Sequence, residues 1–252
     1  MQFMNMGFGL VFFLLLRFVI GKYPAPFPES KNRRREILET LGIWAIWMVG
    51  STIVVLVTPP SVLSAPSPKF IASVSLVLLL PFVVIPALFV LRVNKWTAKD
   101  LGFAKPTSRS VTIATVVFFA VGGVLPLILS DAYEPITVPH LLLALYAPAF
   151  SEEFIFRGII QGKLERALGQ NKAWFYSGIL FGLAHIGANF FGPLWYSKGE
   201  NIAGAFILLA QQIVFGWVYG IIYTKTRSLL PGMVGHYIQD GRLGSILALI
   251  FS

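Results

Sequence analysis

The 252-residue sequence contains no cysteine and few charged residues. The absence of cysteine excludes a disulfide framework, a zinc site built on thiolates and a cysteine nucleophile. Charged residues make up only 12% of the chain, whereas an average soluble protein has about a quarter. At the same time 56% of the residues are hydrophobic, and one water-exposed domain of this size cannot bury so much apolar surface. The composition excludes a soluble globular domain and indicates a membrane protein.

Apolar segments recur along the whole chain. A transmembrane helix needs about 20 mostly apolar residues, and eight stretches meet or approach that length. They are residues 4–20, 37–57, 70–90, 111–129, 140–160, 173–191, 202–223 and 230–250. The loops between them are short, and they contain neither a repeat nor an extramembrane domain. We therefore predict an all-α fold: one polytopic membrane domain over 1–252, with about eight transmembrane helices and a site buried in the bundle.

The 20 lysine and arginine residues are unevenly distributed among the predicted loops. Loops 21–36, 91–110, 161–172 and 224–229 hold 15 of them, and the remaining loops hold 2. Under the positive-inside rule these four loops are cytoplasmic, so that both termini face outside the cell membrane. The net charge of +9 is then an orientation signal with contacts to anionic membrane lipid. A nucleic-acid partner is not indicated, and the sequence points to no oligomeric state.

Three charged residues lie inside the predicted span 140–160. Glu152, Glu153 and Arg157 fall near the bilayer midplane, where each unpaired charge costs about 2.5–3.5 kcal/mol. Glu153 and Arg157 are spaced i,i+4 with the acid first, which allows them to pair on one face of an α-helix. Glu152 is rotated by about 100° from Glu153. It must therefore find a partner on another helix, bind a proton or bind a cation.

Two of the three histidines also fall inside predicted spans. His185 lies in span 173–191, and His236 lies in span 230–250, four residues before Asp240. Because these residues reach a depth similar to that of Glu152, we expect the four side chains to meet. His140 lies at a predicted interface and is expected to have no chemical role. The H-E-x-x-H motif of zinc metalloproteases and the G-x-S-x-G motif of serine hydrolases are both absent.

The three intramembrane motifs resemble those of a known family, the CAAX-protease and bacteriocin-processing family of intramembrane glutamic proteases, also called the Abi family. The family pattern E-E-x-x-x-R is met by Glu152, Glu153 and Arg157, F-x-x-x-H by Phe181 and His185, and H-x-x-x-N/D by His236 and Asp240. Their order along the chain also fits. The resemblance covers about residues 140–240 and agrees with an eight-helix core.

The resemblance implies an intramembrane endopeptidase that needs no cofactor. It assigns Glu152 and His185 to a water that attacks a peptide carbonyl, and His236 and Asp240 to stabilisation of the oxyanion. Glu153 and Arg157 match its supporting pair. Because aspartate donates a hydrogen bond only when protonated, Asp240 acts either as that donor or by orienting His236. Expected substrates are peptides or membrane-protein segments, and processing of prenylated proteins is not implied.

Other interpretations stay open on the sequence alone. Glu152, His185 and His236 form a donor set that can hold a catalytic zinc ion. A non-catalytic membrane partner that confers bacteriocin immunity or regulates a sensor kinase has the same apolar composition. A transporter can use the intramembrane Glu and His residues with Gln211 and Gln212, although no inverted repeat is visible. The sequence assigns no partner to Arg242.

Overall fold

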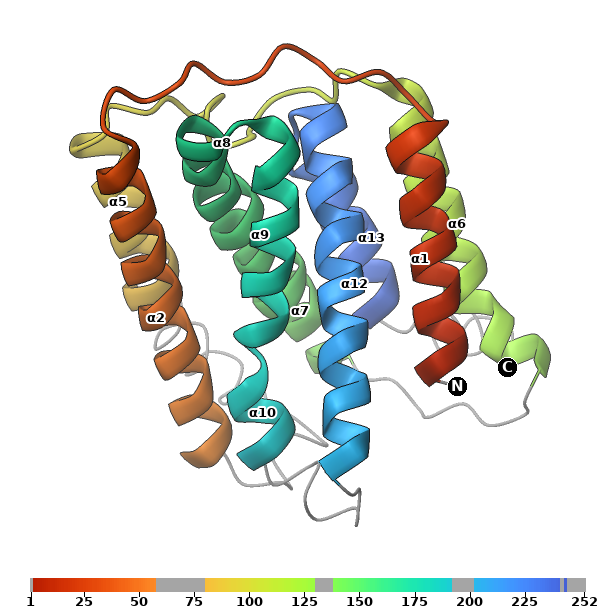
Figure 1. Cartoon of the computed structure of the whole chain (residues 1–252). Helices are drawn as coiled ribbons and strands as arrows, with labels where there is room; N and C mark the ends of the chain where they lie inside the picture. The colour runs from red at the N-terminus through yellow and green to blue at the C-terminus, as the bar shows by residue number, and fades with distance from the viewer. Residues whose placement is uncertain (1, 58–79, 130–137, 192–201, 241–242, 244–252) are drawn as a thin grey trace.

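The protein is described from a computed structural model, which covers residues 2–57, 80–129, 138–191, 202–240 and 243. All regular secondary structure in these ranges is helical (Figure 1), which confirms the all-α prediction. Arg242, part of the predicted span 70–90 and most of the last ten residues of span 230–250 lie outside the described residues.

The helices follow the predicted apolar segments, although several of their ends are shifted. In chain order the segments are α1 (Gln2–Phe18), α2 (Arg33–Val57), η1 (Leu80–Val84), α5 (Ile85–Arg92), α6 (Arg109–Leu129), α7 (Val138–Ala144), η2 (Leu145–Gln161), α8 (Gly162–Leu168), α9 (Gln170–Leu183), α10 (Ile186–Phe191), α12 (Ile202–Thr226) and α13 (Leu230–Asp240). The predicted span 173–191 is thus divided, because the chain turns at Ala184 and His185 between α9 and α10.

The predicted loop 161–172 is mostly helical, which corrects its expected end points. Helix α8 continues from η2 to Leu168, and α9 begins at Gln170, so that only Gly169, at φ 84°, separates them. A positive φ of this size suits glycine. The charged side chains of α8 do not need water, because Lys163 and Glu165 are buried in ion pairs. An ion pair with a distant segment leaves no trace in a hydropathy pattern, and the helix therefore extends beyond the apolar stretch.

The predicted span 140–160 is helical, but most of it has i→i+5 hydrogen bonding. This π-helical segment, η2, runs over Leu145–Gln161 and contains Pro148, which has no N–H to donate. The hydroxyl of Ser151 donates to the carbonyl of Ala147. Helices of this type are rare and often accompany functional sites. The rotation of 100° per residue assumed for an α-helix does not apply within it.

Helices α9 and α12 pack closely along the middle of the bundle (Figure 1), with α1 on the other side of α12. Their backbones meet at two glycines, Gly178 on α9 and Gly216 on α12. A Cβ atom at Gly216 would lie 2.6 Å from the carbonyl oxygen of Gly178. Only residues without a side chain permit this approach, which fixes how far α12 stands from α9.

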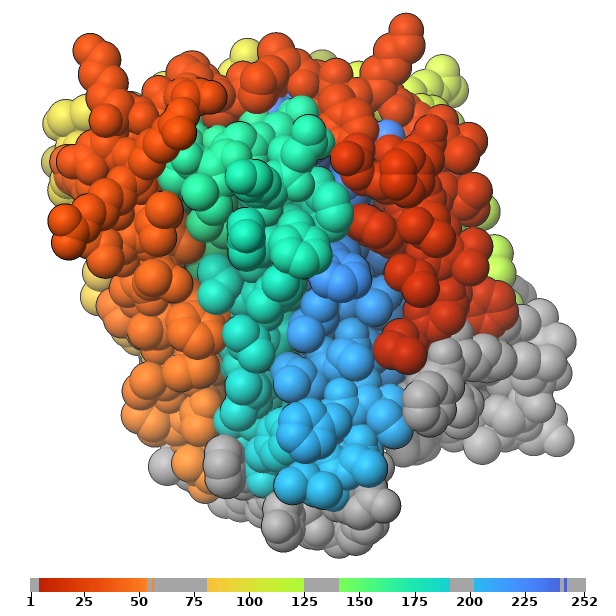
Figure 2. All heavy atoms as spheres, viewed as in Figure 1, coloured from red at the N-terminus to blue at the C-terminus, as the bar shows by residue number. Residues whose placement is uncertain are grey.

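The outside of the bundle is apolar, and several charged side chains are inside it. The helices that form the face in Figure 2 expose Leu14 of α1, Ile46 of α2, Phe175 of α9 and Phe206 of α12. Arg157 and Glu153, in contrast, are almost fully buried. Soluble monomers rarely expose contiguous apolar surface of this kind. An apolar exterior around buried charge is the arrangement that a lipid environment favours.

Two helical stretches in the described residues have the length and composition of a membrane span. They are Arg33–Ile53 and Ile202–Thr226. Three shorter apolar stretches, Asn5–Phe18, Pro81–Arg92 and Arg109–Val124, correspond to further predicted spans. By this criterion two of the eight expected spans are supported, and the eight-helix topology stays a prediction.

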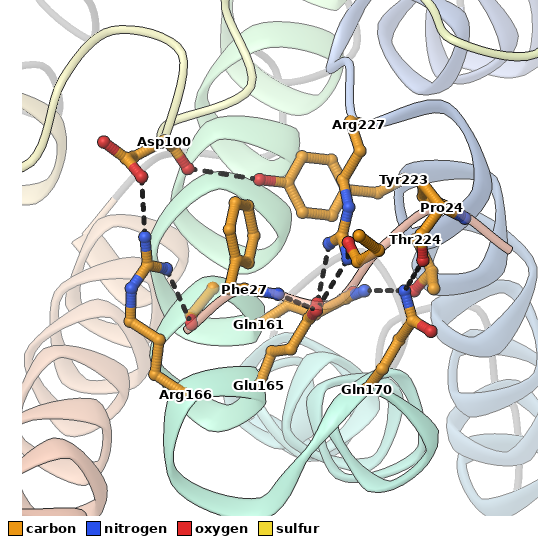
Figure 3. Close-up of polar contacts among 12 residues, drawn as sticks. Pro24, Phe27, Asp100, Gln161, Glu165, Arg166, Gln170, Tyr223, Thr224 and Arg227 are labelled. Atoms are coloured by element: carbon orange, nitrogen blue, oxygen red, sulfur yellow. Dashed lines mark hydrogen bonds and ion pairs between the residues drawn. The ribbon is translucent and has the colours of Figure 1, made fainter. Parts of the chain in front are cut away.

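The four basic loops come together at one end of the bundle, shown at the top of Figure 1. The N–H of Ser30 donates to the carbonyl of Arg166, and the N–H of Thr107 donates to that of Thr226. Figure 3 shows the polar network at this end, in which the buried Glu165 carboxylate accepts two hydrogen bonds from Arg227, at 2.6 and 2.7 Å. The network holds together chain segments that are far apart in sequence.

Candidate functional site

The carboxylate of Glu153 lies between an arginine on its own segment and a histidine on α13. Its Oε2 is 3.5 Å from Nε of Arg157, and its Oε1 is 3.1 Å from Nδ1 of His236. The Glu153 side chain is only 1% exposed. Gly232 on α13 makes room for it, because a Cβ atom there would lie 2.7 Å from Oε2. Glu153 therefore joins η2 to α13 and has little access to a ligand.

Arg157 is fully buried and is surrounded by aromatic rings. Its guanidinium carbon lies 4.4 Å from the ring centre of Phe181 and 5.3 Å from that of Tyr219. The Nη2 group also donates to the carbonyl of Gly216, at 3.4 Å. Cation–π contacts and the Glu153 carboxylate together compensate a charge that has no access to water. This arrangement makes Arg157 a structural partner of Glu153.

Glu152, the neighbouring carboxylate, faces the two intramembrane histidines. Its Oε1 lies 3.9 Å from Nε2 of His185, and its Oε2 lies 3.9 Å from Nε2 of His236. These distances are too long for direct hydrogen bonds. One water oxygen can nevertheless lie within hydrogen-bond distance, about 2.8 Å, of both members of either pair. The Glu152 side chain is 18% exposed, in contrast with Glu153, so that it remains accessible to a small molecule.

His185 lies where the chain turns between α9 and α10, and its ring is held by its own helix. Nδ1 is 2.8 Å from the carbonyl oxygen of Phe181, one turn earlier. A carbonyl can only accept, so this hydrogen bond assigns a hydrogen to Nδ1, and in the neutral imidazole the lone pair is then on Nε2. The F-x-x-x-H spacing therefore has a physical function. It places an acceptor nitrogen of His185 opposite Glu152.

His236 has a carboxylate near each of its ring nitrogens. Nδ1 faces Glu153, as described above, and Nε2 lies 3.3 Å from Oδ2 of Asp240. The ring stacks on Tyr219, with centroids 4.7 Å apart and planes inclined by 19°. An imidazolium can donate to acceptors on both sides, and this environment suits that form. Asp240 is more exposed than the rest of the group, with 36% of its side chain accessible.

The predicted residues surround a cavity of about 220 Å³. It is lined by Glu152, Phe181, His185, Leu208, Gln211, Gln212, Phe215, Tyr219, His236, Gln239 and Asp240. The structure thus brings Glu152, His185, His236 and Asp240 together from three separate segments of the chain: η2, the turn between α9 and α10, and α13. Glu153 and Arg157 lie behind this group and do not line the cavity.

Residues 134–241 match the family model described as type II CAAX prenyl endopeptidase Rce1-like. This part of the chain is similar to that family. The matched region contains every residue that the sequence motifs single out and confirms the resemblance predicted from them. Neither a search of curated proteins nor a search of solved structures gave a match. The Rce1-like family is membrane-associated, and its description is that of a protease family.

Two contacts of the Rce1-like region are not evident from the sequence. Tyr219 stacks on His236, and its hydroxyl donates to Oε1 of Gln239 at 2.9 Å. Nothing in the local pattern distinguishes Tyr219 from the other tyrosines of the chain. The bond between Glu153 and His236 depends on how η2 crosses α13, which no motif spacing specifies.

The adjacent residues Gln211 and Gln212 have different surroundings. Gln212 exchanges hydrogen bonds with the amide of Asn189 on α10, at 2.7 and 3.4 Å, and so joins α12 to α10. The Oε1 atom of Gln211 is buried and has no hydrogen-bond partner among the described residues. A buried carbonyl without a donor is unfavourable. In a cavity wall it is available to a ligand.

Among the described residues, no group of three or more His, Asp or Glu side chains has an arrangement that could hold a metal ion. The separation of 3.9 Å between Glu152 and each histidine nitrogen also exceeds the ligand–ligand distance of about 3.4 Å expected for a tetrahedral zinc site with bonds of about 2.0–2.1 Å. The spacing fits a hydrogen-bonded water better than a bound zinc ion.

Proposed function

We propose that the protein is an intramembrane endopeptidase of the glutamic type, which hydrolyses peptide bonds in peptides or membrane-protein segments. One observation carries this proposal: the two oxygens of Glu152 each lie 3.9 Å from Nε2 of a different histidine. That spacing leaves a place for one water molecule between a carboxylate and two imidazoles. The reaction then requires no cofactor.

Glu152 and His185 are the pair that we assign to water activation. The lone pair on Nε2 of His185 and the carboxylate of Glu152 are both acceptors, so a water between them donates one hydrogen to each. Its own lone pairs are then directed away from both acceptors, toward the rest of the cavity. As the water oxygen bonds to the peptide carbonyl carbon, its proton passes to Glu152, which acts as the general base.

His236 is the group that we assign to the developing oxyanion. When the water attacks, the electron pair of the carbonyl π bond moves to the carbonyl oxygen. The imidazolium of His236 can donate a hydrogen bond to that oxygen from Nε2. Glu153 and Asp240 support this cationic form and fix the plane of the ring, because each lies near one ring nitrogen. In this assignment Asp240 is a positioning residue.

Collapse of the tetrahedral intermediate completes the reaction. The oxyanion re-forms a carbonyl group, the carbon–nitrogen bond breaks, and the leaving nitrogen takes the proton that Glu152 received from water. One water is consumed, and one carboxyl and one amino terminus are formed. Gln211, whose buried Oε1 has no partner among the described residues, is the acceptor that we assign to an N–H of the substrate backbone.

The proposal places this site within the cell membrane, in a single polytopic domain with about eight spans. Its support is the apolar exterior of the bundle and the two stretches with the length of a span. The basic loops 21–36, 91–110, 161–172 and 224–229 are assigned to the cytoplasmic side because they meet at one end. A substrate segment can then reach the cavity from the bilayer.

The proposal is tested by incubating the purified protein in detergent with a peptide library in water enriched in oxygen-18. The wild type is expected to give products that carry the label in the new carboxyl group. Glu152→Gln and His185→Gln variants are expected to lose about 10²–10⁴-fold in cleavage rate, the usual contribution of a general base.

Glu29→Gln is the matched control for these variants. Glu29 is an exposed carboxylate paired with Arg33 on the surface, so its substitution is expected to leave the rate unchanged. Equal cleavage by the wild type and by Glu152→Gln would contradict the proposal. Products without the label would show that water is not the nucleophile.

A further inference from the structure

A second and larger cavity lies at the end of the bundle where the basic loops meet. It has a volume of about 680 Å³ and lies between the segment that follows α1 and the start of α6. Its wall includes three cationic side chains, Lys22, Arg109 and Lys225, and the hydroxyl groups of Thr107, Ser108 and Ser110. None of the described residues that line it is acidic. The cavity is separate from the site around Glu152.

Lys225 differs from the other buried cations at this end of the bundle. Its side chain is only 2% exposed, and its Nζ donates to the backbone carbonyls of Ile20 and Gly21, at 2.8 and 2.9 Å. Lys163, Arg166 and Arg227 each have a carboxylate partner in the described part of the chain (Figure 3 shows the latter two). Lys225 forms no such ion pair with any described residue. Among the described residues, its charge faces two carbonyl dipoles and the ring of Tyr23, 4.5 Å away.

The uncompensated charge of Lys225 favours an anion in the adjacent cavity. A buried ammonium without a counter-ion is costly. An ammonium group has three donors, and the two carbonyls use two of them. The third donor remains for a ligand. Lys22 and Arg109 are exposed at the same cavity and can approach an anion from its open side.

The start of α6 adds a favourable field to the same cavity. Ser108 precedes this helix, and its side chain accepts a hydrogen bond from the N–H of Val111, at 3.4 Å. Ser110 in the first turn also lines the cavity. The amino end of a helix carries a partial positive charge that attracts anions. Hydroxyl donors beside two flexible cations suit the several oxygens of a phosphate group.

We propose that this cavity binds a phosphate group, carried either by an anionic membrane lipid or by a free phosphate. The proposal does not depend on the proposed protease activity. Lys22, Arg109 and Lys225 are the charged contacts, and Ser108 and Ser110 are the hydroxyl contacts. The cavity lies among loops predicted to face the cytoplasm, at the level where lipid headgroups of that leaflet are found.

The test compares binding of three probes to the full-length protein in detergent by native mass spectrometry. The probes are phosphatidylglycerol, phosphatidylcholine and inorganic phosphate. Wild type is expected to bind one phosphatidylglycerol saturably and more tightly than phosphatidylcholine, which has no net charge. Competition by inorganic phosphate would identify the free ion as a ligand of the same site, and no competition would identify the lipid headgroup.

Two double variants with the same loss of charge distinguish a site from general attraction. Lys22→Gln/Arg109→Gln is expected to weaken the binding by about tenfold or more. Lys31→Gln/Arg34→Gln removes two exposed cations from the same end of the molecule but from outside the cavity, and it is expected to change the binding less than about twofold. Equal weakening in the two double variants, or the absence of saturable binding to wild type, would overturn the proposal.

Lys225→Met tests the buried contact directly. This substitution removes hydrogen bonds to two backbone carbonyls, so its thermal unfolding is measured alongside binding. A variant that unfolds as wild type does is expected to lose the saturable site. A folded variant with wild-type affinity would show that Lys225 is not a contact. If Lys225→Met is unstable, the comparison of the two double variants tests the proposed site instead.

Discussion

Glu152 and Glu153 are adjacent in sequence and have the same chemistry, but their partners give them different roles. Glu153 is 1% exposed and contacts both Arg157 and His236. Glu152 is 18% exposed, and none of the described residues gives its side chain a hydrogen bond; the two histidines lie 3.9 Å away. A satisfied carboxylate supports the structure, whereas an unsatisfied one in a cavity remains available for chemistry.

This contrast predicts that only one of the two substitutions, Glu153→Gln, lowers the stability. Glu153→Gln leaves the buried Arg157 without a counter-charge, and breaking a buried pair in this way costs about 3–5 kcal/mol. Glu152→Gln breaks no hydrogen bond to a described residue and is expected to leave the free energy of unfolding nearly unchanged. Thermal unfolding of both variants in the same detergent measures the difference. Equal destabilisation by the two would show that the carboxylates have the same structural role.

Sequence reasoning could predict which residues line the cavity around Glu152, because the motif spacing on each helix is local. The i,i+4 relation between Glu153 and Arg157 follows from helix geometry alone. The bond from Glu153 to His236 could not be predicted, because it requires α13 to approach η2 at Gly232. The interruption of the helix at His185 also left no signal, since the flanking residues are apolar on both sides.

At the scale of the helices, the close approach of α9 and α12 depends on two glycines. A Cβ atom at Gly216 would lie 2.6 Å from the carbonyl oxygen of Gly178, and a backbone atom cannot move aside as a flexible side chain can. Gly216→Ala is therefore expected to destabilise the protein by about 1–3 kcal/mol, the usual cost of overpacking. Thermal unfolding checks this value.

Gly42→Ala provides the matched control on another helix. Nothing lies within 4 Å of a Cβ atom at Gly42 in α2. Alanine is favoured over glycine in a helix by about 0.5–1 kcal/mol, so this variant is expected to be neutral or slightly more stable. A Gly216→Ala variant as stable as Gly42→Ala would mean that α9 and α12 are not in close backbone contact.

Asp100 ties the segment between α5 and α6 to α8. Its carboxylate accepts hydrogen bonds from the backbone and hydroxyl of Thr97 and, at 2.7 Å, from Arg166. Burial raises the pKa of Asp100, but the hydrogen bonds from Thr97 and the charge of Arg166 outweigh burial and hold this pKa below its ordinary value. A carboxyl with a lowered folded-state pKa contributes stability above its unfolded pKa and loses it as the pH falls.

This relation predicts how Asp100→Asn depends on pH. At neutral pH the variant is expected to unfold at a lower temperature than wild type. The difference is expected to shrink below about pH 4, the ordinary pKa of aspartate, and to vanish once the pH is below the folded-state value. Unfolding temperatures of wild type and Asp100→Asn, measured at a series of pH values from 7 downward, test this prediction. A difference that stays constant across this range would exclude an ionic role for Asp100.

The extent of the helices was only partly predictable from the sequence. Most loop positions follow from charge, because lysine and arginine avoid hydrocarbon. The hydropathy pattern did not show that the helix continues over 162–168, where Lys163 forms ion pairs with Glu36 and Glu39 of α2 at 2.9 and 2.5 Å. The residues that neutralise this charge are more than a hundred positions away in the sequence. A hydropathy pattern considers one segment at a time and therefore treats the charge as exposed to water.

At the scale of the whole molecule, the arrangement of the loops predicts which parts of the chain face each side of the membrane. Since the chain contains no cysteine, a single introduced thiol reports the position of one residue. Ala98→Cys, in loop 91–110, is expected to react with a membrane-impermeant thiol reagent only after cells are permeabilised. Ser64→Cys, in a loop predicted to face outside, is expected to react in intact cells. The reverse pattern would invert the topology.

Charged side chains are concentrated in two regions of the bundle. The basic end carries the polar network and the second cavity, and the middle of the bundle carries Glu152 and its histidines. Both arrangements keep charged side chains away from the apolar exterior.

The cleavage rate of wild type and Glu152→Gln on one peptide tests the central claim most directly. The peptide is the one that wild type cleaves fastest, and kcat/KM is measured in excess chelator with Glu29→Gln as control. Wild type and Glu29→Gln are expected to cleave equally with or without chelator, and Glu152→Gln is expected to be slower by at least about 10²-fold. A Glu152→Gln variant as fast as wild type, or activity abolished by the chelator and restored by zinc, would contradict the account.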